Sequence, residues 1–243
     1  MPMRKLFITG TNTGVGKTLA SALLCRELIR QGYSVGYVKP VQTGCFERNG
    51  DFIAPDEEFV KLVCGEKIKT FCPVKFKLPA SPHLSAAEEG ISLDPEKLIH
   101  DIESFSNSED FDFVIIEGAG GISVPLTLEF DMADLCKALI AEMIVVTTTA
   151  LGTLNHTKLT LEYAESRDLA CRVIISGCSE NPDIIEKDNI QLISKMFAGK
   201  VMFQIHEVAG LNTESSEVIK LPEVRFDEEF ISRRDAESQR KSL

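Results

Sequence analysis

Tryptophan is absent from this sequence, and only 7% of its 243 residues are aromatic. No aromatic stripe of the kind that stacks nucleic-acid bases is present. Basic residues are the minority as well, because 26 Lys and Arg stand against 37 Asp and Glu, for a formal net charge of −11. A chain this acidic lacks the broad basic face that binds DNA or RNA, so no nucleic-acid partner is expected.

Several other features are missing. No apolar run reaches about 18 residues, the length of a membrane span, and the apolar stretch near the N-terminus is too short for a secretory signal. The seven cysteines form no CxxC pair, and the four histidines include no ligand-like pair at i, i+4. We interpret the cysteines as reduced thiols. These absences predict a cytoplasmic protein with no membrane partner and no disulfide or zinc framework.

What the sequence does contain is an alternation of short apolar runs and amphipathic stretches. Runs rich in Val and Ile are typical of strands covered on both faces, and strands that alternate with helices indicate a parallel sheet with right-handed crossovers. The predicted strands are 5–9, 34–39, 113–117, 143–148, 171–176 and 200–205, and the predicted helices are 18–31, 56–64, 94–105, 155–167 and 184–197. We therefore expect an α/β fold: a single doubly wound, mainly parallel sheet with helices on both faces over residues 1–221, followed by a charged C-terminal tail at 222–243.

The strongest motif is the segment 10–18, GTNTGVGKT, which follows a predicted strand and opens a predicted helix. Its glycines let successive backbone N–H groups point inward, and the helix N-terminus adds partial positive charge for a phosphate. Lys17 supplies a point charge for the β- and γ-phosphates, and Thr18 offers a hydroxyl to Mg²⁺. The loop reads G-x5-G-K-T from Gly10, one residue longer than the common G-x4-G-K-[ST] pattern.

Two further segments carry chemistry at the same predicted edge of the sheet. The strand at 113–117 delivers Glu117 to its carboxyl end, where a carboxylate can hold Mg²⁺ directly or through water. Gly118 and Gly120 follow, and they allow backbone to approach a ligand closely. Lys39 ends another strand and falls on the same edge. Asp56 opens a helix, where an N-cap role competes with a metal role.

Together these segments resemble the dethiobiotin synthetase family. The resemblance covers residues 3 to 210 and rests on five segments in the family's order and spacing: GTNTGVGKT at 10–18, KPVQTG at 39–44, SPH at 81–83 followed by two alanines at 86–87, EGAGG at 117–121 and LGTLNH at 151–156. It implies a P-loop NTPase-like fold and an enzyme that uses ATP and Mg²⁺. That enzyme would carboxylate 7,8-diaminononanoate with CO2 and close a cyclic urea through a carbamate and a carbamic–phosphoric anhydride, giving dethiobiotin, ADP and phosphate.

The resemblance also implies roles for individual residues. The expected catalytic residues are Lys17 and Lys39. The expected Mg²⁺ ligands are Thr18, Asp56 and Glu117, with Asp51 as an alternative to Asp56. The other expected nucleotide contacts are Asn12, Thr13, Gly14, Val15, Gly16, Gly118, Gly120 and Gly177. The expected substrate contacts are Thr13, Thr43, Gly152, Thr153 and Asn155. In the family the last three lie in a segment that reaches across a dimer interface, so a homodimer is expected too.

The sequence departs from the family pattern at two places. Many members carry an acidic residue where this loop has Gly14. Members often place Asn-Asp after the strand at 171–176, where the Asn reads the adenine edge, but the matching position here is Gly177, with Ser176 and Asn181 nearby. We therefore expect relaxed nucleotide selectivity.

Three other functions share parts of this pattern. ParA/MinD-type switch ATPases resemble this chain in fold, but they carry a lysine at the position of Asn12 and usually an Asp at that of Glu117. Cobyrinate-type amidotransferases share the long loop but need a second domain with a catalytic cysteine, for which 243 residues leave no room. A catalytically inactive nucleotide-binding scaffold is the third alternative, which the presence of Lys17, Lys39 and Glu117 does not favour.

Overall fold

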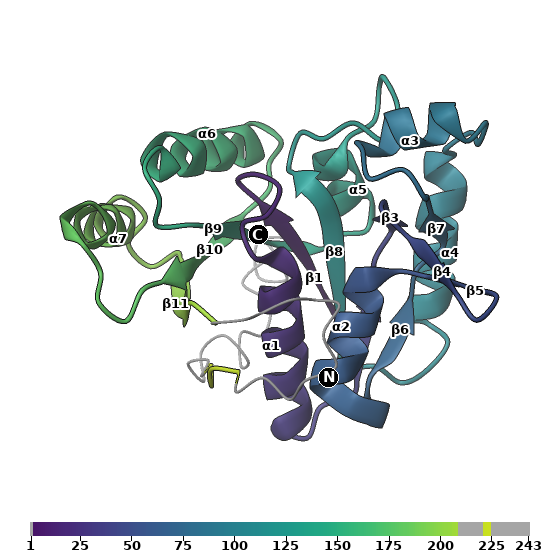
Figure 1. The fold of residues 1–243 in the computed structure, drawn as a ribbon, viewed down its shortest axis with the longest axis horizontal. Coiled ribbons are helices and arrows are strands. Elements are labelled where there is room, and N and C mark those ends of the chain that lie inside the picture. Colours follow the sequence, from purple (N-terminus) through teal and green to yellow (C-terminus); the bar gives the residue numbers. More distant parts are fainter. Residues whose placement is uncertain (1, 209–220, 225–243) are drawn as a thin grey trace, which may run out of the picture.

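A seven-stranded sheet, parallel throughout, forms the centre of the computed structural model, which describes residues 2–208 and 221–224 (Figure 1). The strand order is β11-β10-β9-β1-β8-β2-β6. The strands are β1 (Arg4–Gly10), β2 (Val35–Val38), β6 (Lys69–Phe71), β8 (Phe113–Gly121), β9 (Glu142–Thr147), β10 (Cys171–Cys178) and β11 (Val201–His206). The predicted α/β fold with a mainly parallel sheet is confirmed.

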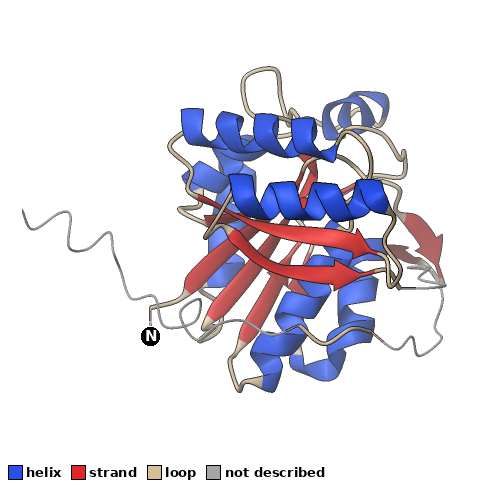
Figure 2. Cartoon of the chain, turned by 90° about the vertical axis from the view of Figure 1, so that its left-hand side faces the viewer, coloured by secondary structure: helices blue, strands red, loops and turns tan. Residues whose placement is uncertain are grey.

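Helices cover both faces of this sheet (Figure 2). One face packs against α1 (Lys17–Arg30) and α2 (Pro55–Cys64). The other packs against α4 (Pro95–Ser106), α5 (Met132–Ala138), α6 (Thr153–Ser166) and α7 (Ile184–Met196). Because side chains alternate along a strand, Leu6 and Ile8 of β1 join the core under α1, whereas Phe7 joins the core on the opposite face. Every strand of this sheet except β6 therefore contributes to both apolar cores.

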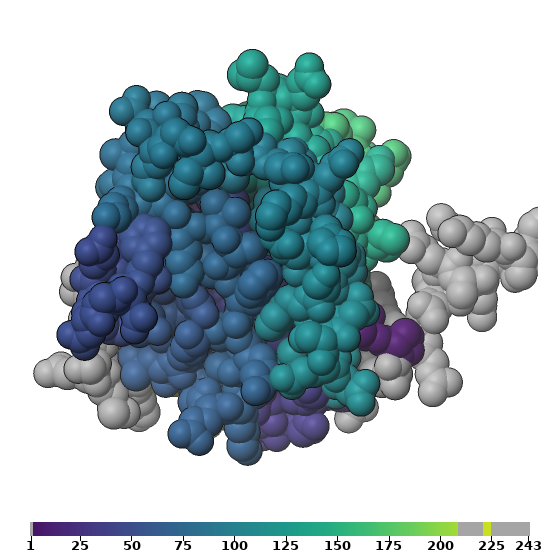
Figure 3. Space-filling view, turned by 90° about the vertical axis from the view of Figure 1, so that its right-hand side faces the viewer, coloured from purple at the N-terminus to yellow at the C-terminus, as the bar shows by residue number. Residues whose placement is uncertain are grey.

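Several short elements were missed by the sequence-based prediction. They are β3 (Val41–Gln42), β4 (Phe46–Arg48), β5 (Asp51–Ile53), β7 (Val74–Lys75), a 3-10 turn at Gly65–Lys67 and α3 (Pro82–Glu88), together with β6 of the main sheet and α5. Most of them lie on the side of the molecule that Figure 3 shows. The strands β4 and β5 form an antiparallel hairpin, and β3 pairs with β7 outside the main sheet. Segments of two to seven residues are too short to display a hydrophobic period.

The boundaries of the long elements follow local chemistry. The Asp94 carboxylate accepts hydrogen bonds from the N–H groups of Glu96 and Lys97, at 3.0 and 3.1 Å, so it caps α4 as the predicted start at 94 implies. Helix α6 begins at Thr153, two residues before its predicted start at 155. Strand β8 continues to Gly121, four residues beyond its predicted end at 117. The longer β8 carries the predicted Gly-rich segment inside a strand rather than a loop.

Residues 221–224 lie against the face covered by α1. Leu221 and Val224 pack into the α1–α2 core, where Val224 is only 4% exposed, and the Arg26 guanidinium donates a hydrogen bond to the Pro222 carbonyl. The predicted tail begins at 222, and most of it, 225–243, lies outside the described residues. Within the described part of the chain, no helix has both the length and the apolar character that a membrane crossing requires.

Candidate active site

The phosphate loop connects β1 to α1 at the carboxyl edge of the sheet. Gly16 has φ +94°, and a Cβ there would lie 2.5 Å from the Ser176 hydroxyl oxygen of β10, so only glycine fits. The Asn12 side-chain oxygen accepts a hydrogen bond from the Thr13 N–H at 2.7 Å. The Lys17 ammonium donates to the Asn12 carbonyl at 3.1 Å. Side-chain and backbone contacts inside the loop therefore hold its shape.

The first turn of α1 presents its N–H groups without a side-chain cap at Gly16. Such uncapped groups, together with the helix dipole, bind phosphate. A Cβ on Gly120 would lie 3.6 Å from the Thr13 hydroxyl oxygen, so the end of β8 runs beside the loop. The structure thus brings the segments 10–18 and 117–121 together, as the sequence predicts for a nucleotide site.

A buried cluster of charges lies next to this loop. The Lys39 ammonium forms ion pairs with Glu117 at 2.9 Å and with Asp56 at 2.6 Å. The Thr18 hydroxyl donates to the same Glu117 oxygen, Oε1, at 2.8 Å. Strand pairing explains the contact, because Tyr37 and Val38 of β2 are in register with Ile115 and Ile116 of β8, and the next pair along is Lys39 and Glu117. Three elements, α1, α2 and β8, therefore converge on Lys39.

The second oxygen of Glu117 has a different partner. Tyr37 is 0% exposed, and its hydroxyl donates to Glu117 Oε2 at 2.9 Å. Sequence reasoning missed Tyr37. The available signal was its position two residues before Lys39 in the predicted strand 34–39, which places both side chains on the same face.

Burial and charge shift the acid–base behaviour of the cluster. Burial, assisted by the nearby Lys39 charge, lowers the pKa of Lys17 to about 8. Burial also acts to lower the pKa of Lys39, but the charges of Asp56 and Glu117 outweigh it, so that pKa lies above its ordinary value. Burial acts to raise the pKa of Asp56, yet the Lys39 charge and hydrogen bonds from Lys39 and Thr18 hold it below its usual range. Lys39 and Asp56 are therefore an ion pair at neutral pH.

The donor set of this cluster fits Mg²⁺. Glu117 and Asp56 supply carboxylate oxygens and Thr18 supplies a hydroxyl, and Mg²⁺ is usually held by one or two carboxylates together with water and substrate phosphates. The Lys39 ammonium now provides the positive charge between the two carboxylates. Among the described residues no group of three or more His, Cys, Asp or Glu side chains is placed to hold a metal ion, so the hydroxyl of Thr18 is part of the proposed donor set.

The alternative metal ligand lies elsewhere. Asp51 is an exposed residue at the start of β5 in the hairpin, whereas Asp56 is in the first turn of α2 and contacts Lys39. Nearer the site, the Lys39 ammonium also approaches the Gly118 carbonyl at 3.4 Å. Thr43 follows β3 and is half-buried, and its carbonyl accepts a hydrogen bond from the Gln42 amide at 3.0 Å. The geometry favours Asp56 over Asp51 at the charge cluster.

The residues expected to bind the substrate carboxylate stand apart from this cluster. They open α6 after β9, and β9 lies on the opposite side of β1 from β8. Gly152 has φ +94° at the N-cap, and Asn155 is exposed. The Thr153 hydroxyl is turned inward, 2.7 Å from the Thr148 carbonyl and 2.8 Å from the Thr147 hydroxyl. Thr153 can therefore contribute its backbone N–H to a ligand more readily than its side chain.

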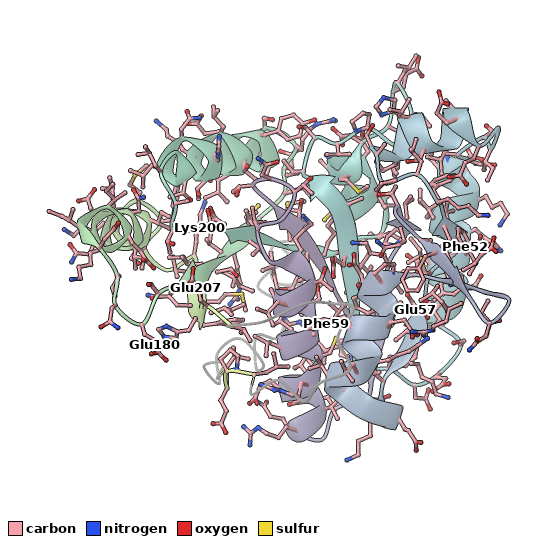
Figure 4. All side chains as sticks on the ribbon, in the orientation of Figure 1. Phe52, Glu57, Phe59, Glu180, Lys200 and Glu207 are labelled. Atoms are coloured by element: carbon pink, nitrogen blue, oxygen red, sulfur yellow. The ribbon has the colours of Figure 1, made fainter. Side chains whose placement is uncertain are left out.

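A cleft of about 690 Å³ opens beside the phosphate loop. Its walls come from the loop, the end of β10 and the segment after β11. The lining residues are Gly14, Val15, Gly16, Leu19, Thr148, Ser176, Gly177, Ser179, Glu180, Asn181, His206, Glu207 and Val208. Figure 4 labels Glu180 and Glu207 on the segments that follow β10 and β11. Val15 and Gly177 thus share one cavity with the carboxylates of those two segments, which sequence reasoning did not single out.

Known proteins are similar to this chain over most of its length. A family model described as an AAA domain matches residues 4–215. The ATP-dependent dethiobiotin synthetase BioD of Anoxybacillus flavithermus is 37% identical over 212 residues, which cover 86% of this chain and 95% of that protein. The protein of the same name from Caldicellulosiruptor saccharolyticus is 39% identical and covers 80% of this chain and 85% of its own length.

Solved structures resemble the fold at low sequence identity. A plasmid partition protein from Borrelia burgdorferi bound to AMPPNP aligns with a TM-score of 0.56 at 12% identity, covering 88% of this chain and 91% of its own. The Aquifex aeolicus MinC:MinD complex aligns with a TM-score of 0.55 at 14% identity, covering 86% and 83%. At such identities the likeness extends to the P-loop NTPase fold alone.

Proposed function

The chain belongs to the ATP-dependent dethiobiotin synthetase family, and on that premise we propose that it converts 7,8-diaminononanoate, CO2 and ATP to dethiobiotin, ADP and phosphate. The observation that carries this proposal is the buried cluster of Lys39, Asp56 and Glu117 beside the phosphate loop. Phosphoryl transfer requires positioning and charge neutralisation more than covalent chemistry from the protein. Two lysines and two carboxylates next to an uncapped helix N-terminus meet that requirement.

The reaction has three steps: carbamate formation, phosphoryl transfer and ring closure. One amine of the substrate adds to CO2 and loses a proton, giving a carbamate. A carbamate oxygen attacks the γ-phosphorus of ATP, the bond to the β–γ bridging oxygen breaks, and ADP leaves. The second amine attacks the carbon of the resulting anhydride, loses a proton, closes the five-membered ring and expels phosphate. One oxygen atom of CO2 therefore ends in phosphate.

Lys17 and Lys39 are the proposed catalytic residues. The carbamate and the γ-phosphate both carry negative charge, and fixed positive charge between them lowers the cost of bringing them together. Lys17 stands at the head of α1, where it reaches the loop carbonyl of Asn12. Lys39 is held at 2.6–2.9 Å from its two carboxylates, which keep it charged and oriented.

Mg²⁺ fits as a partner of the nucleotide at Thr18, Asp56 and Glu117. When bound, it neutralises charge on the phosphate oxygens. The chain's part is to keep the two carboxylates and the hydroxyl in one place before the nucleotide arrives. A cation held by these oxygens would weaken the ion pairs of Lys39 with Asp56 and Glu117, and the Lys39 ammonium would then be available to the reacting oxygens.

The remaining contacts of the substrate are assigned by the same proposal. Thr13 and Thr43 orient the carbamate and phosphate, and the backbone at the start of α6, from Gly152 to Asn155, binds the substrate carboxylate across a homodimer interface. An apolar pocket of about 380 Å³, lined in part by His83, Ala86, Ala87 and Leu126, suits the aliphatic chain of the substrate. The loop residues Gly14 and Gly16, the end of β8 and Gly177 surround the nucleotide, and a cytoplasmic location is part of the same proposal.

Phosphate release with each component left out in turn tests the function. We expect release from ATP and Mg²⁺ to require both 7,8-diaminononanoate and CO2, and dethiobiotin to appear in equal amount by mass spectrometry. Release that ignores the diamine would contradict the proposal and would point to a switch ATPase.

A further inference from the structure

The carboxylate of Glu117 is divided between two environments. Its Oε1 accepts from Thr18 and Lys39, at 2.8 and 2.9 Å, on the side of the phosphate loop. Its Oε2 accepts from the Tyr37 hydroxyl at 2.9 Å inside the protein. Tyr37 and Glu117 are both 0% exposed, so bulk water cannot take the place of the Tyr37 hydroxyl as a donor to Glu117. The carboxylate is thus oriented from within, and only one oxygen faces the loop.

The Tyr37 side chain is fixed in its position beside Glu117. It packs in the core between the sheet and α1, with no room for its ring to leave, and its strand β2 is hydrogen-bonded on both sides, to β8 and β6. The Tyr37 hydroxyl is closed off from solvent, and a tyrosine hydroxyl carries its proton at neutral pH. It therefore remains a donor to Glu117 whatever binds on the loop side.

We propose that Tyr37 is a positioning residue that fixes Glu117, so that a single oxygen, Oε1, is presented to the divalent cation of the nucleotide. This assignment rests on the proposed function for the identity of the cation site. Without the Tyr37 hydroxyl, Oε2 is a buried acceptor with no donor, and the carboxylate gains from turning away from its present orientation. Outer partners of ligating groups commonly set metal affinity by about 10–100-fold.

The first experiment compares Tyr37→Phe with Tyr33→Phe. Tyr33 packs edge-on against Phe113 at 5.2 Å in the same core, but its hydroxyl is not one of the donors to Glu117. Mn²⁺, which shares the oxygen preference of Mg²⁺, is titrated into each protein with a nonhydrolysable ATP analogue and followed by its EPR signal. We expect Tyr37→Phe to weaken Mn²⁺ binding about 10-fold, with nucleotide binding in EDTA unchanged, and Tyr33→Phe to change neither. Equal Mn²⁺ affinity in both variants would overturn the proposal.

A second measurement does not depend on the folding of Tyr37→Phe. The chain has no tryptophan and three tyrosines, so changing Tyr33 and Tyr163 to Phe leaves Tyr37 as the single tyrosine. Mg²⁺ added with the ATP analogue alters the charge opposite Tyr37 across Glu117, and we expect the near-UV absorption band of Tyr37 to shift. The analogue in EDTA is expected to give no shift. A band that ignores Mg²⁺ at saturation would contradict the proposal.

Both measurements are independent of the diamine. Failure of the proposed carboxylation would leave the Mn²⁺ affinities and the tyrosine band as expected, because they need only cation and nucleotide. Failure of the Tyr37 assignment would leave dethiobiotin formation intact and would show as unchanged cation binding. The two outcomes are therefore distinguishable.

Discussion

Lys39 has two proposed roles, one in the transition state and one as the counter-charge of two carboxylates, and a single substitution tests both. Its side chain is 5% exposed, and its ammonium compensates the charges of Asp56 and Glu117. We expect Lys39→Met to lower turnover at least about 10²-fold, since one preorganised charge is lost from the transition state. We also expect Mg²⁺ alone to raise the thermal midpoint of Lys39→Met more than that of the unchanged protein, because the cation no longer competes with an ammonium for the two carboxylates.

A lysine on the same sheet provides the control. Lys5 of β1 pairs with Glu103 of α4 at the opposite edge, away from the loop. Lys5→Met should leave turnover and the response to Mg²⁺ unchanged. Near-normal turnover in Lys39→Met would remove Lys39 from the mechanism, and an equal Mg²⁺ response in all three proteins would remove it from the cation site.

The lowered pKa of Lys17 gives nucleotide binding a pH dependence. The pKa is about 8 in the free protein, and bound phosphate favours the charged ammonium, so the nucleotide complex has a higher pKa. Binding therefore takes up a proton above pH 8, and affinity should fall by up to about tenfold per pH unit as pH rises past that point. Calorimetric titration of an ATP analogue between pH 7 and pH 10 measures this. The profile of Lys17→Arg should be flat there, because an arginine keeps its charge; a flat profile for the unchanged protein contradicts the assignment.

Much of the cluster could be predicted at the scale of residues. Lys17 and Thr18 follow from the loop motif, and Lys39 and Glu117 follow from their positions at strand ends. The choice between Asp51 and Asp56 could not be made, because it depends on the β4–β5 hairpin, whose three-residue strands leave no periodic trace in the sequence. The inward turn of the Thr153 hydroxyl depends on Thr147 and Thr148 of a neighbouring strand end, a contact that local sequence does not encode.

At the scale of elements, α2 must be held in place for Asp56 to reach Lys39. Figure 4 shows Glu57 on the side of α2 toward the hairpin and Phe59 on the side toward α1. The Glu57 carboxylate accepts from the Thr70 hydroxyl of β6 at 2.6 Å and pairs with Lys61 at 2.9 Å and Lys75 at 3.5 Å. Glu57 therefore ties the first turn of α2 to two strands.

Loss of this tie should be visible in both stability and function. We expect Glu57→Ala to lower the free energy of unfolding by about 1.5–3 kcal/mol, the range for hydrogen bonds to a charged group, and to raise the Mg²⁺ concentration needed for turnover. Glu58→Ala removes a more exposed carboxylate that pairs with Arg48, and it should cost less than about 1 kcal/mol. Urea unfolding and Mg²⁺ titrations of both variants measure this; similar values for the two would show that Glu57 has no special part in holding α2.

The core strands were predictable because runs such as FVIIE and MIVVT are apolar on both faces. The short elements between β2 and α4 were not, since they obtain their structure from pairing with distant partners, as β3 does with β7. The start of α6 was placed two residues late because its N-cap is Gly152 in a left-handed conformation. Glycine adopts that conformation readily, but it has no capping side chain that would mark a helix start in the sequence.

At the scale of the whole molecule, residues 221–224 close the face formed by α1 and α2. Val224 is 4% exposed, and the Arg26 guanidinium holds the Pro222 carbonyl. A chain that ends after residue 221 should therefore be less stable than one that ends after 224, by about 1.5–3 kcal/mol, the value of burying one valine-sized side chain. Denaturant unfolding of the two truncated proteins gives the difference directly, and equal stabilities would show that this segment adds nothing to the core.

The fold as a whole does not identify the reaction, because plasmid partition and cell-division proteins share it at TM-scores of 0.56 and 0.55. In a hydrolytic ATPase the γ-phosphorus of ATP meets water, whereas under the proposed function it meets a carbamate oxygen. We assign the cluster around Lys39 and Glu117 to attack by the carbamate oxygen. The fate of a single oxygen atom distinguishes this reaction from attack by water.

Oxygen transfer from CO2 to phosphate is the most direct measurement of that claim. A single turnover is run with C¹⁸O2, the diamine, ATP and Mg²⁺, and is quenched before the label exchanges with water. The account predicts that each phosphate released carries one ¹⁸O atom and that its formation matches that of dethiobiotin. Phosphate released without ¹⁸O would show that water, not the carbamate, attacks ATP, and the assigned chemistry of this site would be wrong.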